Sequence, residues 1–300
     1  MDTNKIVLGS ANFGSSVSKN LALSIIDYAF DVGINKIDTA DSYFGSEEII
    51  GSALKGRRDK FFLASKVGNP SEIGSGLSES HIESSLNNSL IKLNTDFLDV
   101  YFSHNYDKNT SLFETMSTYN KIKESGKVNH FGCSNFTLDQ LISSREISSK
   151  SNLINYTFVQ PVFNIIEFHS EFDFLLYSNK NKLVSWGYSP LAGGLLTGKY
   201  LEGIPPTSRA SVFPNANPRQ AGFIPKISAS TNKIVRSIIT IADEYEVSST
   251  QLSISWALSQ SAISSVIIGV SSLVQLSHIL DFKIDPEAIA KVDKLLISSF

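Results

Sequence analysis

Short runs of apolar and β-branched residues alternate with longer amphipathic stretches through nearly the whole chain. The runs that predict strands cover residues 5–8, 34–37, 61–67, 97–103, 128–134, 158–161, 183–186 and 265–268. The amphipathic stretches predict helices over residues 21–32, 46–54, 78–93, 112–124, 137–147, 171–179, 233–246, 250–259 and 272–280. Apolar strands that alternate with helices are typical of a parallel sheet covered by helices. Eight such units predict an α/β fold, a closed (β/α)8 TIM barrel that forms one domain over residues 1–300.

One long stretch breaks this alternation after the seventh expected strand. Residues 195–231 contain Pro205, Pro206, Pro214, Pro218 and Pro225, and no helical or strand period extends through them. Loops of this length inside a compact domain usually have a function, such as covering a bound ligand. The sequence therefore predicts a long loop after strand 7 that acts as a lid.

Composition excludes several classes of protein. The formal net charge of −3 gives no basic surface for nucleic acid, and no apolar run approaches the roughly 18 residues of a membrane span. The single cysteine, Cys133, excludes an internal disulfide framework, and the five histidines lack the close spacing of a metal site. We therefore expect a protein that binds no metal, nucleic acid or membrane. Because the first residues carry no signal-peptide pattern, we also expect a cytoplasmic location.

Polar side chains follow the expected strands at the end where a barrel has its active site. Asp38 follows the second strand and Lys66 lies near the end of the third, while His104 follows the fourth and Tyr43 lies five residues after Asp38. A phenol is a poor acid at neutral pH, but a nearby ammonium stabilises its phenolate, and a carboxylate can hold that ammonium in place. A neutral imidazole can orient a carbonyl oxygen. The four residues can therefore protonate a developing alkoxide, and the missing hydride has to come from a nicotinamide cofactor.

Two other patterns indicate different chemistry but fit it poorly. Residues 193–200 (GGLLTGKY) are close to a phosphate-binding P-loop, but the last position is Tyr rather than Ser or Thr. Asp38 with Asp41, or Glu47 with Glu48, could suggest the paired carboxylates of a glycosidase. Such an enzyme needs carboxylates on opposite sides of a sugar, whereas the fourth and seventh strands here end in His and Tyr.

Several motifs resemble those of the aldo-keto reductase superfamily, in the same order, from Leu8 to about Leu280. They are GINKIDTADSYFGSEEIIGSAL (33–54), FFLASKVG (61–68), LDVYFSHNYD (98–107), GCSNF (132–136), YSPLAGGLLTGKY (188–200) and VIIGVSSLVQL (266–276). The resemblance implies an enzyme that reduces an aldehyde or ketone to an alcohol with NAD(P)H. It implies that the catalytic residues are Asp38, Tyr43, Lys66 and His104, with Tyr43 as the general acid.

The resemblance also implies which residues bind the cofactor. From the nicotinamide end to the adenosine end they are Ser134, Asn135, Gln160, Tyr188, Ser189, Leu191, Gly193, Gly269, Ser271 and Gln275. Tyr188 is expected to stack on the nicotinamide ring, and Ser134, Asn135 and Gln160 to bind its carboxamide. NADP(H) is the expected cofactor. NAD(H) stays open, because residues 269–275 lack the Arg or Lys that would bind a 2′-phosphate, unless Arg209, Arg219 or Lys226 of the long loop supplies the charge.

The expected partner is a small-molecule carbonyl compound, and a sugar or sugar derivative is one candidate. Phe13 and Asn105 are expected to line the substrate pocket, together with Tyr106 and residues 213–223; Phe13 stands where the family usually has Trp. Two alternatives stay open. One is an NAD-linked sugar or polyol dehydrogenase that runs in the oxidative direction. The other is a cofactor-binding regulatory subunit with little turnover, like the channel-associated β-subunits of the superfamily.

Overall fold

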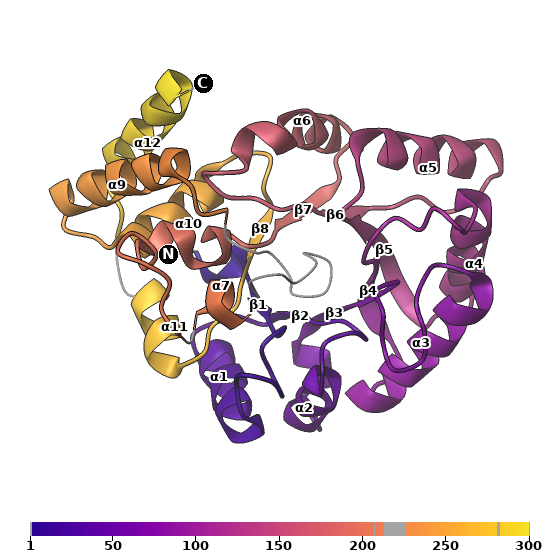
Figure 1. Cartoon of the computed structure of the whole chain (residues 1–300). Helices are drawn as coiled ribbons and strands as arrows, with labels where there is room; N and C mark the ends of the chain where they lie inside the picture. Colours follow the sequence, from indigo (N-terminus) through magenta and orange to yellow (C-terminus); the bar gives the residue numbers. More distant parts are fainter. Residues whose placement is uncertain (1, 207, 213–225, 281–282, 300) are drawn as a thin grey trace.

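Eight parallel strands form a closed barrel in chain order, with β1 paired to both β2 and β8 (Figure 1). The computed structural model describes residues 2–206, 208–212, 226–280 and 283–299. The strands are β1 (Ile6–Gly9), β2 (Lys36–Asp38), β3 (Phe62–Val67), β4 (Leu98–Ser103), β5 (Val128–Ser134), β6 (Phe158–Gln160), β7 (Val184–Gly187) and β8 (Ser265–Ile268). The predicted TIM barrel is therefore confirmed, and every predicted strand end lies within two residues of the observed one.

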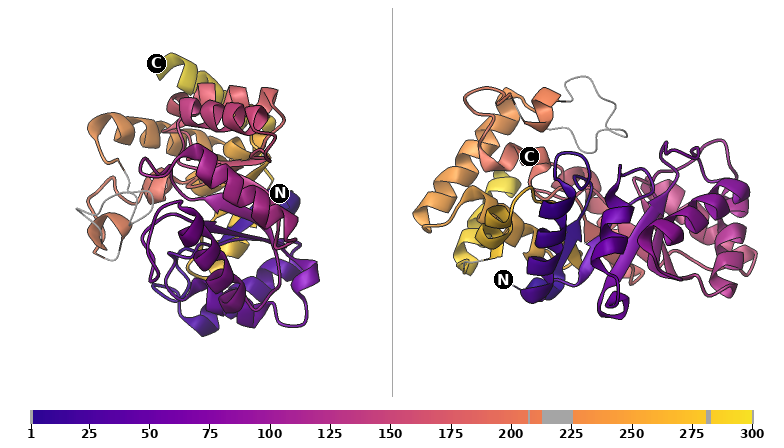
Figure 2. Two further views of the ribbon diagram at one scale, coloured as in Figure 1. Left: turned by 90° about the vertical axis from the view of Figure 1, so that its right-hand side faces the viewer. Right: turned by 90° about the horizontal axis from the view of Figure 1, so that it is seen from below.

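Helices surround the barrel on its outside (Figures 1 and 2). The main ones are α1 (Lys19–Asp31), α2 (Ser46–Ala53), α3 (Glu79–Leu93), α4 (Leu112–Glu124), α5 (Leu138–Lys150), α6 (Phe172–Lys180), α9 (Ala229–Glu244), α10 (Ser249–Ser259), α11 (Leu273–Leu280) and α12 (Pro286–Ser299). Several begin at a side-chain cap that satisfies a free backbone N–H. At the start of α5, for example, Thr137 and Gln140 form a reciprocal capping box.

The chain after strand 7 differs from the prediction in two ways. Residues 195–231 are not irregular throughout, because a 3-10 helix covers Ala192–Thr197, α7 covers Arg209–Val212, and α9 begins at Ala229. Residues 213–225 lie outside the described part of the chain. Helix α12 was not predicted, although Pro at its first position and apolar residues at 289, 292 and 296 are the usual signals of a helix start and of one buried face.

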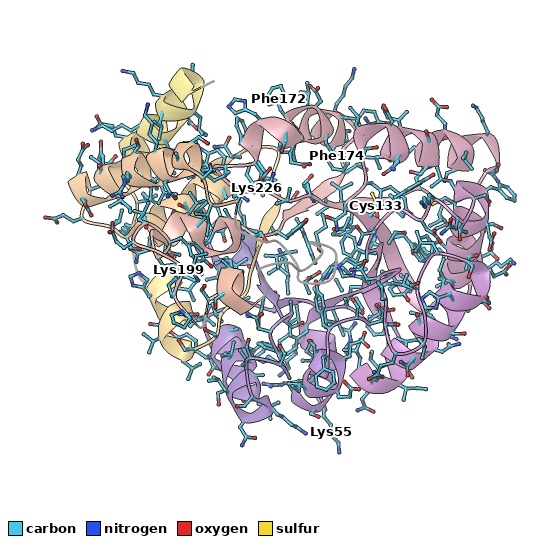
Figure 3. The ribbon with its side chains drawn as sticks, viewed as in Figure 1. Lys55, Cys133, Phe172, Phe174, Lys199 and Lys226 are labelled. Atoms are coloured by element: carbon cyan, nitrogen blue, oxygen red, sulfur yellow. The ribbon has the colours of Figure 1, made fainter. Side chains whose placement is uncertain are left out.

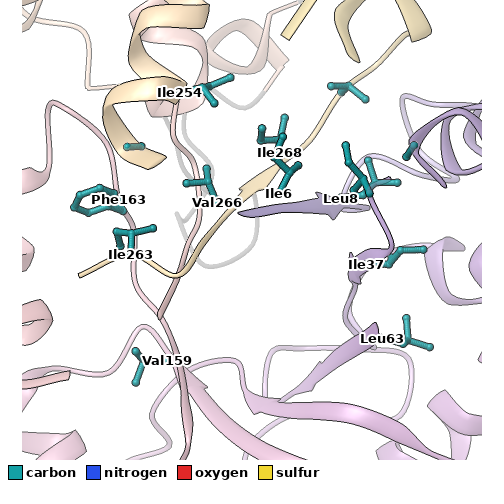
Figure 4. Packing of buried hydrophobic residues seen from close by; sticks show 14 of the residues in the cluster. Ile6, Leu8, Ile37, Leu63, Val159, Phe163, Ile254, Ile263, Val266 and Ile268 are labelled. Carbon is teal, nitrogen blue, oxygen red and sulfur yellow. The ribbon is translucent and has the colours of Figure 1, made fainter. Parts of the chain in front are cut away.

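The core has two layers of apolar side chains, one on each side of the strands. The inner layer fills the barrel with Val7, Ala64, Val100, Phe102, Phe158, Trp186 and Ile267. At Gly132 an added Cβ would lie 2.4 Å from Cε1 of Phe102, so the absence of a side chain makes room for that ring. The outer layer packs strands against helices, as Figure 4 shows for Leu8, Val266 and Ile254. Because the strands are parallel, the side chains at their carboxyl ends lie at the same mouth of the barrel.

Among the described residues, no helix combines the length and the apolar character that crossing a membrane requires.

Candidate active site

Lys66 lies at the centre of the candidate site, on β3 and without exposed surface. Its Nζ donates to Oδ2 of Asp38 at 2.6 Å and to the backbone carbonyl of Thr39 at 2.7 Å. Nζ also lies 3.4 Å from the hydroxyl of Tyr43. Burial is the largest single influence on Lys66 and lowers the pKa of its ammonium, but the charges of Asp38 and Tyr43 and the hydrogen bonds to both together raise that pKa above its ordinary value. The side chain is therefore a fixed positive charge beside a phenol.

Asp38 is 3% exposed and is held at the end of β2 by two side chains. While Oδ2 accepts from Lys66, Oδ1 accepts a 2.8 Å hydrogen bond from Nε2 of Gln160 on β6. Its backbone carbonyl accepts from the amide of Ser10 at 3.0 Å and from the hydroxyl of Ser10 at 2.8 Å. The hydroxyl of Ser46, at the start of α2, donates to that of Ser10 at 2.7 Å. The carboxylate that holds Lys66 is therefore held in place itself.

Tyr43 lies in the turn between β2 and α2, and its side chain is partly exposed. Its backbone amide donates to the carbonyl of Ala40 at 3.1 Å, which fixes the turn. The ring meets that of His104 edge to face, with 5.7 Å between the ring centroids. The phenol thus lies between the buried ammonium of Lys66 and the imidazole, with part of its surface open to a ligand.

His104 follows β4 and is 8% exposed. Burial, and then the positive charge of Lys66, lower the pKa of its imidazole well below the ordinary value. Within the described part of the chain, Nδ1 is buried and has no hydrogen-bond partner. The ring is therefore neutral at physiological pH, which suits a group that orients a carbonyl oxygen. The structure thus brings together all four residues that the sequence singled out as catalytic.

The residues expected at the nicotinamide end also lie together, after β5, β6 and β7. The hydroxyl of Tyr188 donates to Oδ1 of Asn135 at 2.7 Å, and Nδ2 of Asn135 donates to the carbonyl of His104 at 2.9 Å. Ser134 donates to the carbonyl of Gln160 at 2.8 Å. Burial, followed by the charge of Glu171, raises the pKa of Tyr188, so its hydroxyl stays protonated. Asn135 has φ of 56°, a backbone region that Asn tolerates better than most residues.

The backbone after β7 turns sharply where the pyrophosphate contact was expected. Ser189 and Gly193 both have positive φ, 55° and 65° respectively, and Leu191 immediately precedes the 3-10 helix at Ala192–Thr197. The carbonyl of Gly193 accepts a 3.3 Å hydrogen bond from the hydroxyl of Tyr200. This tight turn explains the resemblance to a P-loop, because both are Gly-rich backbones that a phosphate can approach closely.

The residues expected at the adenosine end follow β8. Gly269 comes directly after the strand, and an added Cβ there would meet nothing closer than 3.7 Å. Oε1 of Gln275, on α11, accepts from the amide of Ser271 at 2.8 Å and from its hydroxyl at 3.0 Å. The turn is therefore stabilised by its own uncharged side chains.

The two residues expected in the substrate pocket, Phe13 and Asn105, differ in their exposure. Phe13 has no exposed surface and belongs to the outer core layer, so it supports the loop after β1 from below. Asn105 is partly exposed beside His104 and donates from Nδ2 to Oδ1 of Asn69. Tyr106 packs edge to face on Phe136, with 5.5 Å between the ring centroids. Residues 213–223, also expected at the pocket, lie outside the described residues.

An acidic pair near Tyr188 was not predicted from the sequence. Glu167 and Glu171 lie in the segment after β6, and burial followed by the charge of Glu167 raises the pKa of Glu171 to about 7. Nζ of Lys226 lies 2.9 Å from Oε1 of Glu167, and Figure 3 places Lys226 close to the barrel opening. Lys226 had been considered for a 2′-phosphate, but here it pairs with a carboxylate. Neither glutamate belongs to a motif, so only the fold shows that they lie together.

The residues present fit a dinucleotide. Hydroxyl and amide groups at the ends of β5 and β6 are of the kind that would hold a carboxamide, and the partly exposed ring of Tyr188 lies beside Asn135. The Gly-rich backbone at Gly193 and Gly194, both with positive φ, has the ammonium of Lys199 beside it, and an ammonium is a group suited to a diphosphate. In the described residues no group of three or more His, Cys, Asp or Glu side chains is arranged to hold a metal ion.

Comparison with known proteins supports the same assignment. The model of the Aldo/keto reductase family matches residues 5–297. A probable voltage-gated potassium channel subunit beta from Oryza sativa subsp. japonica is 31% identical over 302 residues, covering 95% of this chain and 90% of that protein. The L-glyceraldehyde 3-phosphate reductase of Escherichia coli (strain K12) is 31% identical over 280 residues, covering 89% of this chain and 80% of the reductase.

A third relative, the uncharacterized oxidoreductase YqkF of Bacillus subtilis (strain 168), is 29% identical over 283 residues, covering 92% of this chain and 86% of that protein. The family match spans the barrel from β1 to α12 and includes Lys66 and the three residues gathered around it. The chain belongs to the aldo/keto reductase family and is an NAD(P)-dependent oxidoreductase.

Proposed function

We propose that the protein reduces a small aldehyde or ketone to the alcohol, with Tyr43 as the general acid. The observation that carries this proposal is the position of Nζ of Lys66, 2.6 Å from the Asp38 carboxylate and 3.4 Å from the Tyr43 hydroxyl. A buried positive charge at this distance stabilises the phenolate that forms when Tyr43 gives up its proton. General acid catalysis of this kind contributes about 10²–10⁴-fold to a rate.

Each of the four side chains has one role in this proposal. Tyr43 donates its proton to the carbonyl oxygen as negative charge develops there, and Lys66 stabilises the resulting phenolate. Asp38 fixes the ammonium of Lys66, and the neutral imidazole of His104 orients the carbonyl oxygen toward Tyr43. A reduced nicotinamide, when bound, supplies the hydride for the carbonyl carbon. Because Lys66 and Asp38 are buried, these fixed charges act more strongly than they would in water.

The cofactor contacts follow the order of the strands. Ser134, Asn135 and Gln160 are proposed to bind the carboxamide, with Tyr188 against one face of the nicotinamide ring. Ser189, Leu191 and Gly193 are proposed to lie along the diphosphate, and the turn stabilised by Ser271 and Gln275 to lie at the adenosine end. NADP(H) is the proposed cofactor, and NAD(H) is the alternative that the uncharged turn supports.

The proposed substrate is a small carbonyl compound derived from a sugar. The Asn69 and Asn105 amides beside His104 can donate hydrogen bonds to hydroxyl groups that flank a reacting carbonyl. One relative is named for the reduction of L-glyceraldehyde 3-phosphate, which is a three-carbon compound of this class.

Fluorescence titration with NADPH and with NADH tests the proposal, followed by addition of 4-nitrobenzaldehyde or L-glyceraldehyde 3-phosphate to follow oxidation of the bound cofactor. Binding with turnover is the expected result, and the tighter cofactor decides between NADP(H) and NAD(H). If neither cofactor binds, the proposal is wrong.

Binding without turnover on any aldehyde would favour a regulatory, cofactor-sensing subunit. That alternative is kept because two matched relatives are named as probable potassium channel β-subunits. Rapid oxidation of a polyol with NAD⁺ and slow reduction of aldehydes would instead favour a dehydrogenase.

A further inference from the structure

Two carboxylates that the proposed reaction does not use lie buried behind Lys66. Strand register pairs Ser65 of β3 with Tyr101 of β4, and successive side chains of a strand point to opposite faces. Lys66 points into the barrel, so Ser65 and Tyr101 both point outward, toward α2 and α3. Oε1 of Glu47, on α2, accepts a 2.7 Å hydrogen bond from the hydroxyl of Ser65. Glu47 is 2% exposed, so its carboxylate is sealed between the sheet and the helices.

Asp41, in the turn that carries Tyr43, is the second of the two carboxylates, and with Glu47, Ser65 and Tyr101 it forms the cluster behind Lys66. Its backbone amide donates to the carbonyl of Lys66 at 3.2 Å, which places the two residues side by side. In the described part of the chain no donor reaches either carboxylate oxygen of Asp41 with hydrogen-bond geometry, although the Ser85 hydroxyl lies close enough to lower its pKa. Burial, and then the nearby charge of Glu47, raise the pKa of Asp41. Asp41 and Glu47 therefore form a buried like-charge pair.

Tyr101 is a second, independent observation, because its buried hydroxyl lacks a hydrogen-bond partner among the described residues. The side chain has no exposed surface. Burial, and then the charges of Asp41, Tyr119 and Glu47, raise the pKa of the Tyr101 hydroxyl, so it stays protonated and can donate. A buried hydroxyl without a partner is destabilising, and donation to a carboxylate of the pair would remove that cost.

Among the described residues, no ion pair joins a cation to Asp41 or to Glu47. Lys66 is the buried ammonium beside them, but its 2.6 Å ion pair is with Asp38. Lys92 of α3 acts on Glu47, but its own ion pairs, both 3.2 Å long, are with the exposed Glu48 and Glu72. The titratable side chains that face the pair from the surrounding elements are Glu48 (α2), Lys66 (β3), Tyr101 (β4), His81 and Lys92 (α3) and Tyr119 (α4). Two carboxylates in such surroundings do not both ionise at neutral pH.

We propose that Asp41 and Glu47 hold one proton between them at neutral pH, and that this proton leaves the charge of Lys66 available to Tyr43. The second half of this proposal rests on the proposed function, whereas the first does not. The pKa directions agree with it. Burial first and Glu47 second raise the pKa of Asp41 to about 7, and burial raises the pKa of Glu47.

The pair then acts as a positioning group whose effect depends on pH. Below about pH 7 the pair keeps its proton, and Asp38 is the carboxylate that balances Lys66. Above that pH the proton is lost and a second negative charge develops beside Lys66. That charge reduces the stabilisation of the Tyr43 phenolate, so reductase activity is expected to fall as pH rises through the titration of the pair.

Carbon-13 NMR of protein labelled at the Asp and Glu carboxyl carbons tests the first half directly, without any assay of activity. We expect one carboxyl resonance, absent from Asp41→Asn protein, to titrate near pH 7 in the wild type. Glu47→Gln should move that titration lower by roughly one pH unit, because it removes the like charge. Glu48→Gln, which neutralises the adjacent exposed residue, should leave it unchanged. A resonance already at the ionised position at pH 5 overturns the proposal.

The pH dependence of unfolding provides a second measurement, which stays informative if Asp41→Asn folds poorly. A carboxyl whose pKa is raised by folding binds more protons in the folded state, so stability falls as pH rises from about 4 to about 7. We expect wild-type and Glu48→Gln protein to release about one extra proton on unfolding in this range, and Glu47→Gln protein to release clearly less. Equal proton release in all three overturns the shared proton.

The pH profile of kcat tests the second half of the proposal. Asp41→Asn is expected to remove the decline above pH 7 while leaving KM and the rate at pH 6 close to wild type. If the NMR titration is present and the pH profile does not change, the pair holds its proton but does not act on Lys66. If the titration is present and no substrate is turned over, the proposed function fails while the shared proton stands.

Discussion

Nζ of Lys66 lies 2.6 Å from Oδ2 of Asp38, and neither side chain has appreciable exposed surface. Each charge is therefore stable in the core because of the other. Removing one partner of a buried ion pair leaves an uncompensated charge, which typically costs about 3–5 kcal/mol.

We therefore expect Lys66→Met to destabilise the protein by roughly 3–5 kcal/mol, measured as the free energy of unfolding in urea. The double variant Lys66→Met/Asp38→Asn should recover most of that loss, because the remaining groups are neutral, and yet remain inactive. A double variant as unstable as Lys66→Met would show that the loss in free energy of unfolding comes from the packing of the lysine stem and not from the uncompensated charge.

His104 should stay neutral at a pH where a solvent-exposed histidine is charged. Its pKa is lowered by burial and by Lys66, so on acidification the unfolded chain takes up a proton at this residue before the folded chain does. The contribution of His104 is a loss of stability as pH falls below about 6.5. We expect His104→Gln to lose less stability than wild type between pH 7 and pH 5. Nitrogen-15 NMR should show a neutral ring at pH 6, and a charged imidazole there would contradict this account.

The hydroxyl and the ring of Tyr188 should contribute differently to cofactor binding. Tyr188→Phe removes the hydrogen bond to Asn135 but keeps the aromatic face, so we expect the Kd for the preferred cofactor to rise only about 2–10-fold. Tyr188→Ala should weaken binding considerably more, because it also removes the stacking surface. Fluorescence titration measures both, with Tyr28→Phe on the distant helix α1 as the control. Equal effects of the two substitutions would mean that the ring does not contact the cofactor.

Gly51 should be required for the packing of α2 on α3. A Cβ added there would lie 2.4 Å from the carbonyl oxygen of Lys92 and 2.8 Å from the backbone carbon of Leu93, and backbone cannot move aside as a flexible side chain can. We expect Gly51→Ala to lower the free energy of unfolding by about 1–3 kcal/mol. Ser52→Ala, at the exposed neighbouring position, should change it little. Equal stability of the two variants would show that α2 shifts freely.

The barrel and its four central side chains could be predicted because each has a local signal. Strand residues repeat in short apolar runs, and Asp38, Lys66 and His104 each stand at a strand end that a parallel barrel brings to one mouth. Helix α12 also carries a local signal, a first-position proline with periodic apolar residues.

Contacts between distant parts of the chain could not be predicted in the same way. Gln160 donates a hydrogen bond to Asp38, 122 positions away in the sequence. Glu167 forms an ion pair with Lys226, which follows β7 and α7. Phe13 was expected to face the substrate, but its burial depends on how the turn after β1 folds against α1 and α2, which no pattern within the turn encodes. The pairing of Asp41 with Glu47 similarly depends on how α2 and the turn before it pack on β3.

Transfer of hydride from bound NADPH or NADH to 4-nitrobenzaldehyde in a single turnover, followed by stopped-flow fluorescence, tests the central claim most directly. The wild type and Tyr43→Phe would be compared at the same cofactor saturation. The account predicts that Tyr43→Phe lowers the single-turnover rate by about 10²–10⁴-fold, equivalent to roughly 3–5 kcal/mol of barrier, with the cofactor Kd unchanged. A rate within a few-fold of wild type would contradict the assignment of Tyr43 as the general acid.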